Sequence, residues 1–192
     1  MKLKLITLIK SVPELVETAK ECSSLGIPDY YIAGGAITQV IWNHLEERPL
    51  LDRVKDFDIV YFDSRATHSE EWYEAELNQR LNHSIKIDVK NQATIHSWYP
   101  KKFGCSIPAY DRVEQGIDSW LSAFAIGFHL DKQGQIGIYA PYGLEDAFER
   151  KVKPNKIAMT ETSYNKMTKS FKARWPSINV EAWETDAEVN SH

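Results

Sequence analysis

The sequence predicts an α/β protein in which helices flank a small mixed β-sheet. Stretches with the apolar spacing of amphipathic helices alternate along the chain with short runs rich in β-branched and aromatic residues. Hydrophobic residues make up 43% and charged residues 26% of the 192 residues, which is ordinary for a globular protein. This length is sufficient for one domain with a substantial core, which we assign to residues 1–175.

The first half of the chain predicts three helices and three strands. Ser11 as N-cap, Pro13 in the first turn and Gly26 after the last turn delimit the first helix. Ser69, followed by acidic residues, opens the third helix. The strands are rich in β-branched and aromatic residues or alternate strictly between polar and apolar residues. In order, these elements are a helix over 11–26, a strand over 30–33, a helix over 36–47, a strand over 56–62, a helix over 69–81 and a strand over 84–90.

The second half begins with an aromatic cluster and continues with a hairpin and two helices. The cluster (Trp98, Tyr99, Phe103 and Tyr110) is first interpreted as core packing, with stacking on a nucleobase as the alternative. Two apolar runs joined by the turn DKQG predict the hairpin. In order, these elements are strands over 122–130 and 134–140 and helices over 141–151 and 162–175.

Charge is distributed unevenly along the chain. The net charge of −4 makes general nucleic-acid binding an unexpected property. Residues 150–174 nevertheless carry eight Lys or Arg and one Glu. This basic helical segment is either a solvated helix face or a surface that helps to hold a polyanion beside a carboxylate site. Residues 176–192 form an acidic tail that we expect to be partly loose.

The sequence carries no sign of a membrane or a secreted context. No apolar run reaches the length of a membrane span, and the first residues lack the pattern of a signal-peptide cleavage site. Cys22 and Cys105 lie far apart without metal-type spacing, which is typical of a reducing compartment. The six histidines also lack the spacing of zinc ligands. We therefore expect a cytoplasmic protein that does not interact with membranes.

Three aspartates are the candidate catalytic residues. Asp56 and Asp58 are two residues apart on an apolar strand, so both side chains leave the same face of the sheet. Asp88 lies between apolar residues in the next strand and would fall within about 5–8 Å of the pair if the two strands are neighbours. Such carboxylates repel one another unless a cation lies among them. Three convergent carboxylates predict a site for Mg²⁺ or Mn²⁺.

Gly34 and Gly35 separate a predicted strand from a predicted helix. One interpretation is a turn with a backbone angle that only glycine adopts without steric penalty. The other is that a ligand approaches the backbone closely, because a bare helix N-terminus attracts an anion such as phosphate. The neighbouring carboxylates favour the second interpretation.

Together, these residues resemble the signature of the nucleotidyltransferase superfold, which is shared with DNA polymerase β. More narrowly, five segments resemble a family of bacterial proteins of about this length that are described as nucleotidyltransferase-like. This resemblance extends from about residue 30 to residue 176 and implies a nucleotidyltransferase fold. The segments are GGAITQVIWN, DFDIVYFD, KIDVKNQATIHSWY, IYAPYGLEDAF and VKPN.

The resemblance also implies roles for the site residues. Gly34 and Gly35 would contact the phosphates of a nucleotide, and Asp56 and Asp58 would bind metal. Asp88 would act on a second metal and on the attacking group.

Two positions depart from the family's pattern as we identify it. Thr38 and Thr94 stand where that family often has a basic residue, which removes two expected contacts to phosphate. The interval of 20 residues between Gly35 and Asp56 is long for the broad superfold but usual in the narrow family.

The predicted function is a metal-dependent transfer of NMP from NTP to an acceptor, which is a small molecule, a protein or RNA. The first alternative is a degenerate fold of the same type that acts as a nucleotide sensor or an antitoxin-like partner. The second alternative is a metal-dependent phosphohydrolase that uses the same acids.

Overall fold

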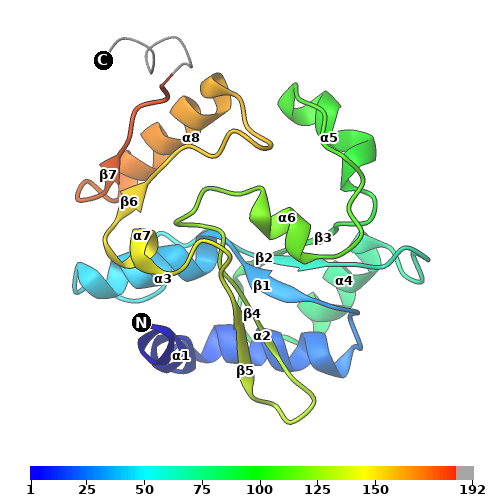
Figure 1. Ribbon diagram of the computed structural model, residues 1–192. Coiled ribbons are helices and arrows are strands. Elements are labelled where there is room, and N and C mark those ends of the chain that lie inside the picture. The colour runs from blue at the N-terminus through cyan, green and yellow to red at the C-terminus, as the bar shows by residue number, and fades with distance from the viewer. Residues whose placement is uncertain (185–192) are drawn as a thin grey trace.

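The computed structural model describes residues 1–184 and shows a mixed α/β protein, which confirms the predicted fold class (Figure 1). Asp186 and Glu188 of the predicted acidic tail lie outside the described residues. In chain order the elements are α1 (Lys2–Lys10), α2 (Pro13–Ser24), β1 (Tyr31–Ala33), α3 (Gly35–Leu45), β2 (Asp56–Tyr61), α4 (Glu70–Arg80), β3 (Lys86–Asn91), α5 (Ile95–Phe103), α6 (Glu114–Asp118), β4 (Gly127–Leu130), β5 (Ile136–Tyr139), α7 (Glu145–Phe148), β6 (Lys151–Val152), α8 (Glu161–Arg174) and β7 (Asn179–Val180).

Five strands form one mixed sheet in the order β3-β2-β1-β4-β5. β2 and β3 run parallel, as the α4 crossover between them allows, whereas the other pairs are antiparallel. The pair β4–β5 is the hairpin predicted from the turn DKQG, but β4 begins at Gly127, so residues 122–126 of the first predicted strand lie outside it. β6 and β7 form a separate parallel pair.

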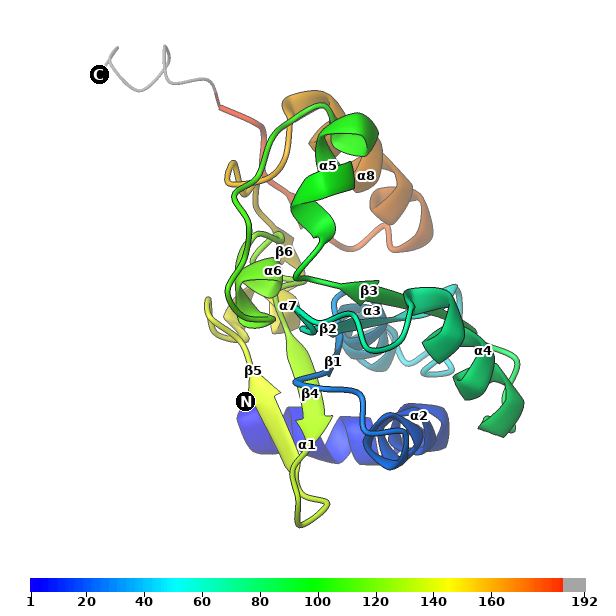
Figure 2. The ribbon, with the colours of Figure 1, turned by 90° about the vertical axis from the view of Figure 1, so that its right-hand side faces the viewer.

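Helices α1 to α4 lie on one face of the sheet, while α6 lies on the other (Figures 1 and 2). Strand alternation explains the two layers. Ile32, Ile59 and Val89 point into the large core that the first four helices cover. Ala33 and Val60 point to the opposite face, where a smaller apolar cluster includes residues next to and within α6. The second face is therefore covered only in part, which leaves room for a cleft.

Aromatic rings join α8 to the body of the protein. Trp42 on α3 contacts Trp175 with ring centroids 5.6 Å apart, and Phe124 with centroids 5.3 Å apart. Phe124 in turn stacks on Phe171 of α8 at 4.6 Å. These edge and stacked arrangements are the favourable geometries for aromatic pairs. They fix α8 against α3 and the segment before β4.

A buried amide completes this junction. The indole N–H of Trp175 donates to the side-chain oxygen of Asn43 at 2.8 Å. The amide nitrogen of Asn43 donates to the carbonyl oxygens of Leu50 and Asp52 at 3.0 and 2.7 Å. Asn43 and Trp175 are fully buried, so these hydrogen bonds replace contacts with water.

The first helices differ from the prediction. The sequence interpretation assigned no element to residues 2–10, where α1 forms and buries Leu5, Leu8 and Ile9. Because α1 ends directly before α2, Ser11 belongs to its last turn, and the hydroxyl donates to the carbonyl of Leu8 at 2.7 Å. The N-cap position of α2 is Val12. The prediction that Ser11 caps this helix is therefore wrong.

Two further differences concern the second half. The helix predicted over 141–151 is limited to Glu145–Phe148, because the chain before it contains Gly143 with a φ of +77°. α5 was not predicted, since Pro100 lies inside it and disfavours a helix. Packing stabilises it: Ile95 and Tyr99 contact a small core with Ile107. The helix predicted over 162–175 and the strands predicted over 30–33, 56–62 and 84–90 are confirmed to within two residues.

We expect Asn43→Ala to lower the free energy of unfolding by about 2–4 kcal/mol, because it leaves the buried Trp175 indole and two carbonyl oxygens without partners. Urea unfolding followed by tryptophan fluorescence measures this loss. Asn165→Ala, on an exposed position of α8, is the control and should change stability by no more than about 0.5 kcal/mol. Equal stabilities of the two variants would contradict a role of this amide in joining α3 to α8.

Candidate active site

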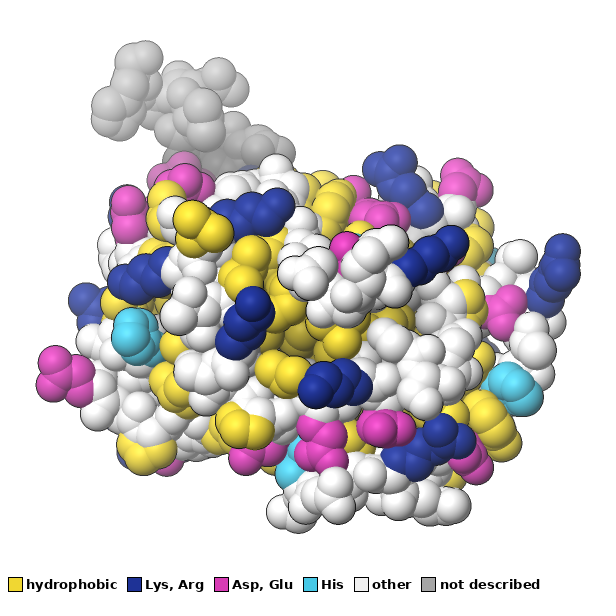
Figure 3. All heavy atoms as spheres, turned by 90° about the horizontal axis from the view of Figure 1, so that it is seen from below, with side chains coloured by type: hydrophobic (Ala, Val, Ile, Leu, Met, Phe, Trp, Pro, Cys, Tyr) yellow, Lys and Arg dark blue, Asp and Glu magenta, His cyan; other side chains and the backbone are white. Residues whose placement is uncertain are grey.

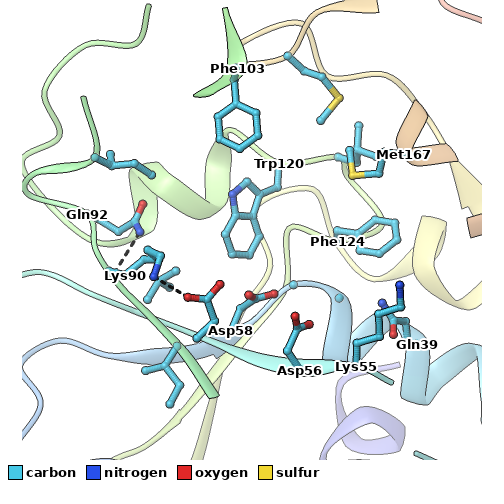
Figure 4. Close-up of a pocket in the computed structure, with 18 of the residues that line it drawn as sticks. Gln39, Lys55, Asp56, Asp58, Lys90, Gln92, Phe103, Trp120, Phe124 and Met167 are labelled. Atoms are coloured by element: carbon cyan, nitrogen blue, oxygen red, sulfur yellow. Dashed lines mark hydrogen bonds and ion pairs between the residues drawn. The ribbon is translucent and has the colours of Figure 1, made fainter. Parts of the chain in front are cut away.

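The pairing of β2 with β3 brings the predicted carboxylates together. Asp58 is the direct partner of Asp88 in the parallel register. Asp56 lies two residues before Asp58 and therefore on the same face of the sheet. Figure 4 shows Asp56 and Asp58 directed into one space above the strands. All three aspartates line the same cleft, as the sequence predicts.

The cleft has a volume of about 430 Å³ and two chemically different sides. Its floor consists of the strand residues with the three carboxylates and of the turn at Gly34 and Gly35. Its opposite wall is apolar and comes from α5, α8 and the segment before β4 (Figure 4). The aromatic residues of this wall are Trp98, Tyr99, Phe103, Trp120, Phe124 and Phe171.

The floor opposes the ionisation of Asp58. Burial raises the pKa of Asp58 from an ordinary 3.8 to about 7, and repulsion from Asp56 and Asp88 adds to this rise. Attraction to Lys90 and Lys86 offsets part of it. A cation close to Asp58 would favour the ionised form. The floor is thus suited to binding a positively charged ligand.

Asp88 already has a cationic partner. The ammonium of Lys90 donates to its Oδ1 at 2.5 Å, drawn as a dashed line in Figure 4. The same ammonium lies 3.6 Å from carboxylate oxygens of Glu70 and Glu74 on α4. Partial burial disfavours the charged lysine, but Asp88, Glu70 and Glu74 together raise the pKa of Lys90 above its usual value. Asp56, Asp58 and Asp88 form a row of carboxylates on the cleft floor. Lys90 places a fixed positive charge at the Asp88 end of this row.

The glycine turn is both strained for other residues and open to the cleft. Gly34 has a φ of +71°, and a Cβ atom there would come within 2.8 Å of the Trp120 ring. Its N–H donates to the carbonyl of Ile126 at 2.9 Å, which holds the turn against the segment before β4. Gly35 begins α3, and no side chain caps this N-terminus. The steric interpretation is thus confirmed for Gly34, while Gly35 lines the cleft at the uncapped end of α3.

The donor set is compatible with a magnesium or manganese ion. Within residues 1–184, no three His, Cys, Asp or Glu side chains form a ready-made metal site. Mg²⁺ is commonly held by one or two carboxylates, while water and substrate phosphates supply the remaining oxygens. Asp56 and Asp58 provide hard oxygen ligands in that number, and burial together with repulsion from Asp56 and Asp88 raises the pKa of Asp58. These residues fit an ion that arrives together with a phosphate ligand.

The predicted aromatic cluster divides between the cleft and the core. Trp98, Tyr99 and Phe103 line the cleft. The Tyr99 hydroxyl donates to the carbonyl of Ala158 at 2.6 Å, which fixes the ring. Tyr110 is buried in a small core and does not line the cleft. Core packing is therefore the confirmed interpretation for Tyr110, whereas the other three rings present surface to a ligand.

The basic segment contributes one residue to the cleft. Of the Lys and Arg residues in 150–174, all of which lie in the described part of the chain, only Arg174 lines it, beside Lys55 and Asp56. Burial lowers the pKa of Arg174, while attraction to Asp56 acts in the opposite direction. Lys166 is exposed, as expected for a solvated helix face. Figure 3 shows a different face of the molecule, where basic and acidic side chains are interspersed among apolar ones.

The two threonines that depart from the family's pattern lie outside the cleft. Thr38 is fully buried and donates to the carbonyl of Ala123 at 2.6 Å. Thr94 is exposed in the N-cap position of α5. Two important cleft residues were missed instead. Lys90 could have been found from its spacing of two residues from Asp88, whereas nothing in the local sequence indicates that Trp120 reaches Gly34.

The fold resembles solved nucleotidyltransferase structures. A protein whose NMR structure reveals a CCA-adding enzyme head domain has a TM-score of 0.79 and 21% identity, over 95% of this chain and 97% of that chain. A Thermotoga maritima CCA-adding enzyme complexed with tRNA has a TM-score of 0.52 and 15% identity, over 97% of this chain and 43% of the enzyme. The chain thus spans less than half of that enzyme. At these identities the likeness shows a shared fold. A search of curated proteins finds no match.

Two further observations concern the whole chain. Within residues 1–184, no helix is sufficiently long and apolar to cross a membrane. A family model described as nucleotidyltransferase matches residues 20–180, which contain the glycine turn, the three aspartates and the aromatic wall. Since this match covers most of the 192 residues, the chain belongs to the nucleotidyltransferase family.

Proposed function

We propose that the protein transfers a nucleoside monophosphate from an NTP to an acceptor and releases pyrophosphate. An oxygen of the acceptor forms a bond to the α-phosphorus, while the bond between that phosphorus and the pyrophosphate oxygen breaks. The observation that carries this proposal is the row of Asp56, Asp58 and Asp88 facing an uncapped helix N-terminus in one cleft. Family membership supports the reaction class, and the cleft residues support the roles below.

We assign Asp56 and Asp58 to a Mg²⁺ or Mn²⁺ ion that accompanies the triphosphate. When bound, such an ion neutralises charge that develops on phosphate oxygens. The two aspartates lie on one strand, where Asp58 is paired with both β1 and β3 and Asp56 with β3, which holds them in position. Rigid ligands keep the reacting phosphate in position, which accounts for much of the rate in phosphoryl-transfer reactions.

We assign Asp88 to the acceptor. It lies beside Asp58 on the neighbouring strand, and Lys90 binds one of its two carboxylate oxygens. The other oxygen can accept a hydrogen bond from an attacking hydroxyl and take up its proton. A positioned carboxylate of this kind typically contributes about 10²–10⁴-fold to a rate.

The glycine turn is the proposed site of the phosphates. The first N–H groups of α3 have no side-chain cap, so they and the positive end of the helix dipole can bind phosphate oxygens. Lys55 and Arg174 lie on the same cleft and add positive charge. A side chain at Gly34 would collide with Trp120, so only glycine lets the Trp120 ring pack against this turn.

The aromatic wall is the proposed contact surface for the nucleobase. Stacking on an aromatic side chain is worth about 1–3 kcal/mol for a base and depends little on which base it is. The acceptor class is a small molecule, a protein or RNA. The tRNA bound by the Thermotoga maritima enzyme is a property of that protein, which this chain matches over less than half of its length.

The activity is proposed for the cytoplasm, because Cys22 and Cys105 are both free thiols, as is usual in a reducing compartment. The main alternative is an NTP-binding module without turnover. The ion pair on Asp88 supports this alternative, since one oxygen of the third carboxylate is already engaged. In the second alternative, a phosphohydrolase, water takes the place of the acceptor. Products distinguish the three functions.

Binding of metal and nucleotide should be linked. We expect NTP with Mg²⁺ to raise the melting temperature, with a stabilisation of about 2.7 kcal/mol at a ligand concentration of 100 Kd. NTP with excess chelator should give a much smaller shift, because the floor of the cleft repels an anion that carries no metal ion. Differential scanning fluorimetry measures both. Equal melting-temperature shifts with Mg²⁺ and with chelator would indicate that the NTP binds to the basic segment of residues 150–174. The absence of any shift would contradict nucleotide binding.

Asp58→Asn should stabilise the metal-free protein at alkaline pH. The pKa of Asp58 is about 7 in the folded chain and about 3.8 otherwise, so the folded state holds more protons between these values and loses stability as the pH rises. Above pH 7 the penalty is on the order of 2 kcal/mol after allowance for solvent screening. Asn removes it, so the melting temperature of the variant should exceed that of the unchanged protein at pH 8 and converge with it near pH 4.

The same variant should lose the further stabilisation by Mg²⁺ and NTP that the unchanged protein shows. This second measurement separates a metal ligand from an ordinary strained carboxylate. An Asp58→Asn variant that is less stable at pH 8, or that responds fully to Mg²⁺ and NTP, would contradict the assignment of Asp58.

Asp88→Asn should reduce turnover by about 10²-fold or more while metal–NTP still binds. We would measure pyrophosphate release with each NTP and a cell extract as the source of acceptor, and affinity by calorimetry on the same preparations. Asp111→Asn, at an exposed position outside the cleft, is the matched control. Full activity of Asp88→Asn would refute its assignment to the acceptor. Binding without pyrophosphate release in the unchanged protein would favour the binding module, and release of phosphate from NTP without an acceptor would favour the hydrolase.

A further inference from the structure

Lys90 lies at the Asp88 end of the row of carboxylates. It follows Asp88 by two residues on β3, so the two side chains share the face of the sheet that forms the cleft floor. Its ammonium donates to Asp88 Oδ1 at 2.5 Å and to the carbonyl of Val89 at 2.9 Å. The positive charge therefore sits directly on the third carboxylate.

Helix α4 holds this ammonium in place. The carboxylates of Glu70 and Glu74 each approach it to 3.6 Å. These carboxylates are fixed in turn, because they accept backbone N–H groups of the edge strand β3: Asn91 N–H donates to Glu70 at 2.7 Å and Val89 N–H to Glu74 at 2.9 Å. Lys90 thus belongs to a network that spans two elements and is not free to swing away from Asp88.

The other end of the row is different. Within residues 1–184, no side chain forms a hydrogen bond or a close ion pair with Asp56 or Asp58. A divalent ion at Asp88 would compete with Lys90 for Oδ1 and would lie next to a fixed positive charge. An ion at Asp56 and Asp58 would not have to displace a hydrogen-bonded ammonium from its ligands.

We propose that the Lys90 ammonium is the built-in cation of the Asp88 end, and that the site consequently binds one divalent ion, through Asp56 and Asp58. This inference rests on the proposed function. Lys90 acts here as a positioning residue: it holds one oxygen of Asp88 and balances its charge, so that the other oxygen is directed to the acceptor without a second ion.

The number of bound ions tests this inference without any turnover. Mn²⁺ is titrated into the full chain with an NTP analogue that has a methylene group in place of the α,β-bridging oxygen, and the bound ions are counted by electron paramagnetic resonance. We expect one Mn²⁺ per chain. Lys90→Met removes the charge but keeps most of the side-chain length, and it should increase the count to two. Lys90→Arg keeps the charge and should retain one.

Lys86→Met is the matched control, because Lys86 lies on the same strand face but is exposed and does not line the cleft. Its count should remain one. Two ions in the unchanged protein, or one ion in a folded Lys90→Met, would overturn the inference. If Lys90→Met does not fold, the counts for the unchanged protein and for Lys90→Arg still decide. No bound Mn²⁺ in the unchanged protein would instead refute the proposed function, so the two failures are distinguishable.

Discussion

The parallel pairing of β2 with β3 places Asp58 directly beside Asp88, and the rest of the site depends on this contact between like charges. A parallel register is possible here because α4 carries the chain back across the sheet between the two strands. The alternate residues of β2, including Phe57 and Ile59, are buried in the main core, so the strand cannot slip by one position without exposing them. Because Phe57 and Ile59 must stay in the core on one face of the sheet, Asp58 is held beside Asp88 on the other face, where the two carboxylates repel each other.

The fold limits this repulsion at one end of the row only. β3 is an edge strand, and the carboxylates of Glu70 and Glu74 satisfy two of its outward N–H groups. The same carboxylates hold Lys90 on Asp88, so one helix face both protects the edge and supplies a counter-charge. Burial and repulsion from Asp56 and Asp88 raise the pKa of Asp58, and attraction to Lys90 and Lys86 offsets this rise only in part. A cation bound at Asp56 and Asp58 would therefore relieve more carboxylate repulsion than a cation bound at Asp88.

Local patterns were sufficient to predict β1, β2, β3, the hairpin and the shared face of Asp56 and Asp58, because these follow from a period of two along one strand, but not the short strands β6 and β7. The partner of Asp58 depends on the register between two strands, which no local pattern determines. The approach of Trp120 to Gly34 depends on chain segments far apart in the sequence. α5 was not predicted for a related reason. Pro100 disfavours a helix locally, and only tertiary packing overcomes this preference.

Helices α3, α4 and α8 differ at their N-termini. α4 and α8 are each capped by a hydroxyl, from Ser69 and Thr160, and each has acidic residues in its first turn. α3 has neither: Gly34 offers no side chain, and its first turn contains no acid. A side-chain cap typically contributes about 1 kcal/mol to stability, and the largely buried helix α3 lacks this contribution. Gly35, the first residue of α3, lines the carboxylate cleft, where a side-chain cap would occupy the N–H groups that an anionic ligand would need.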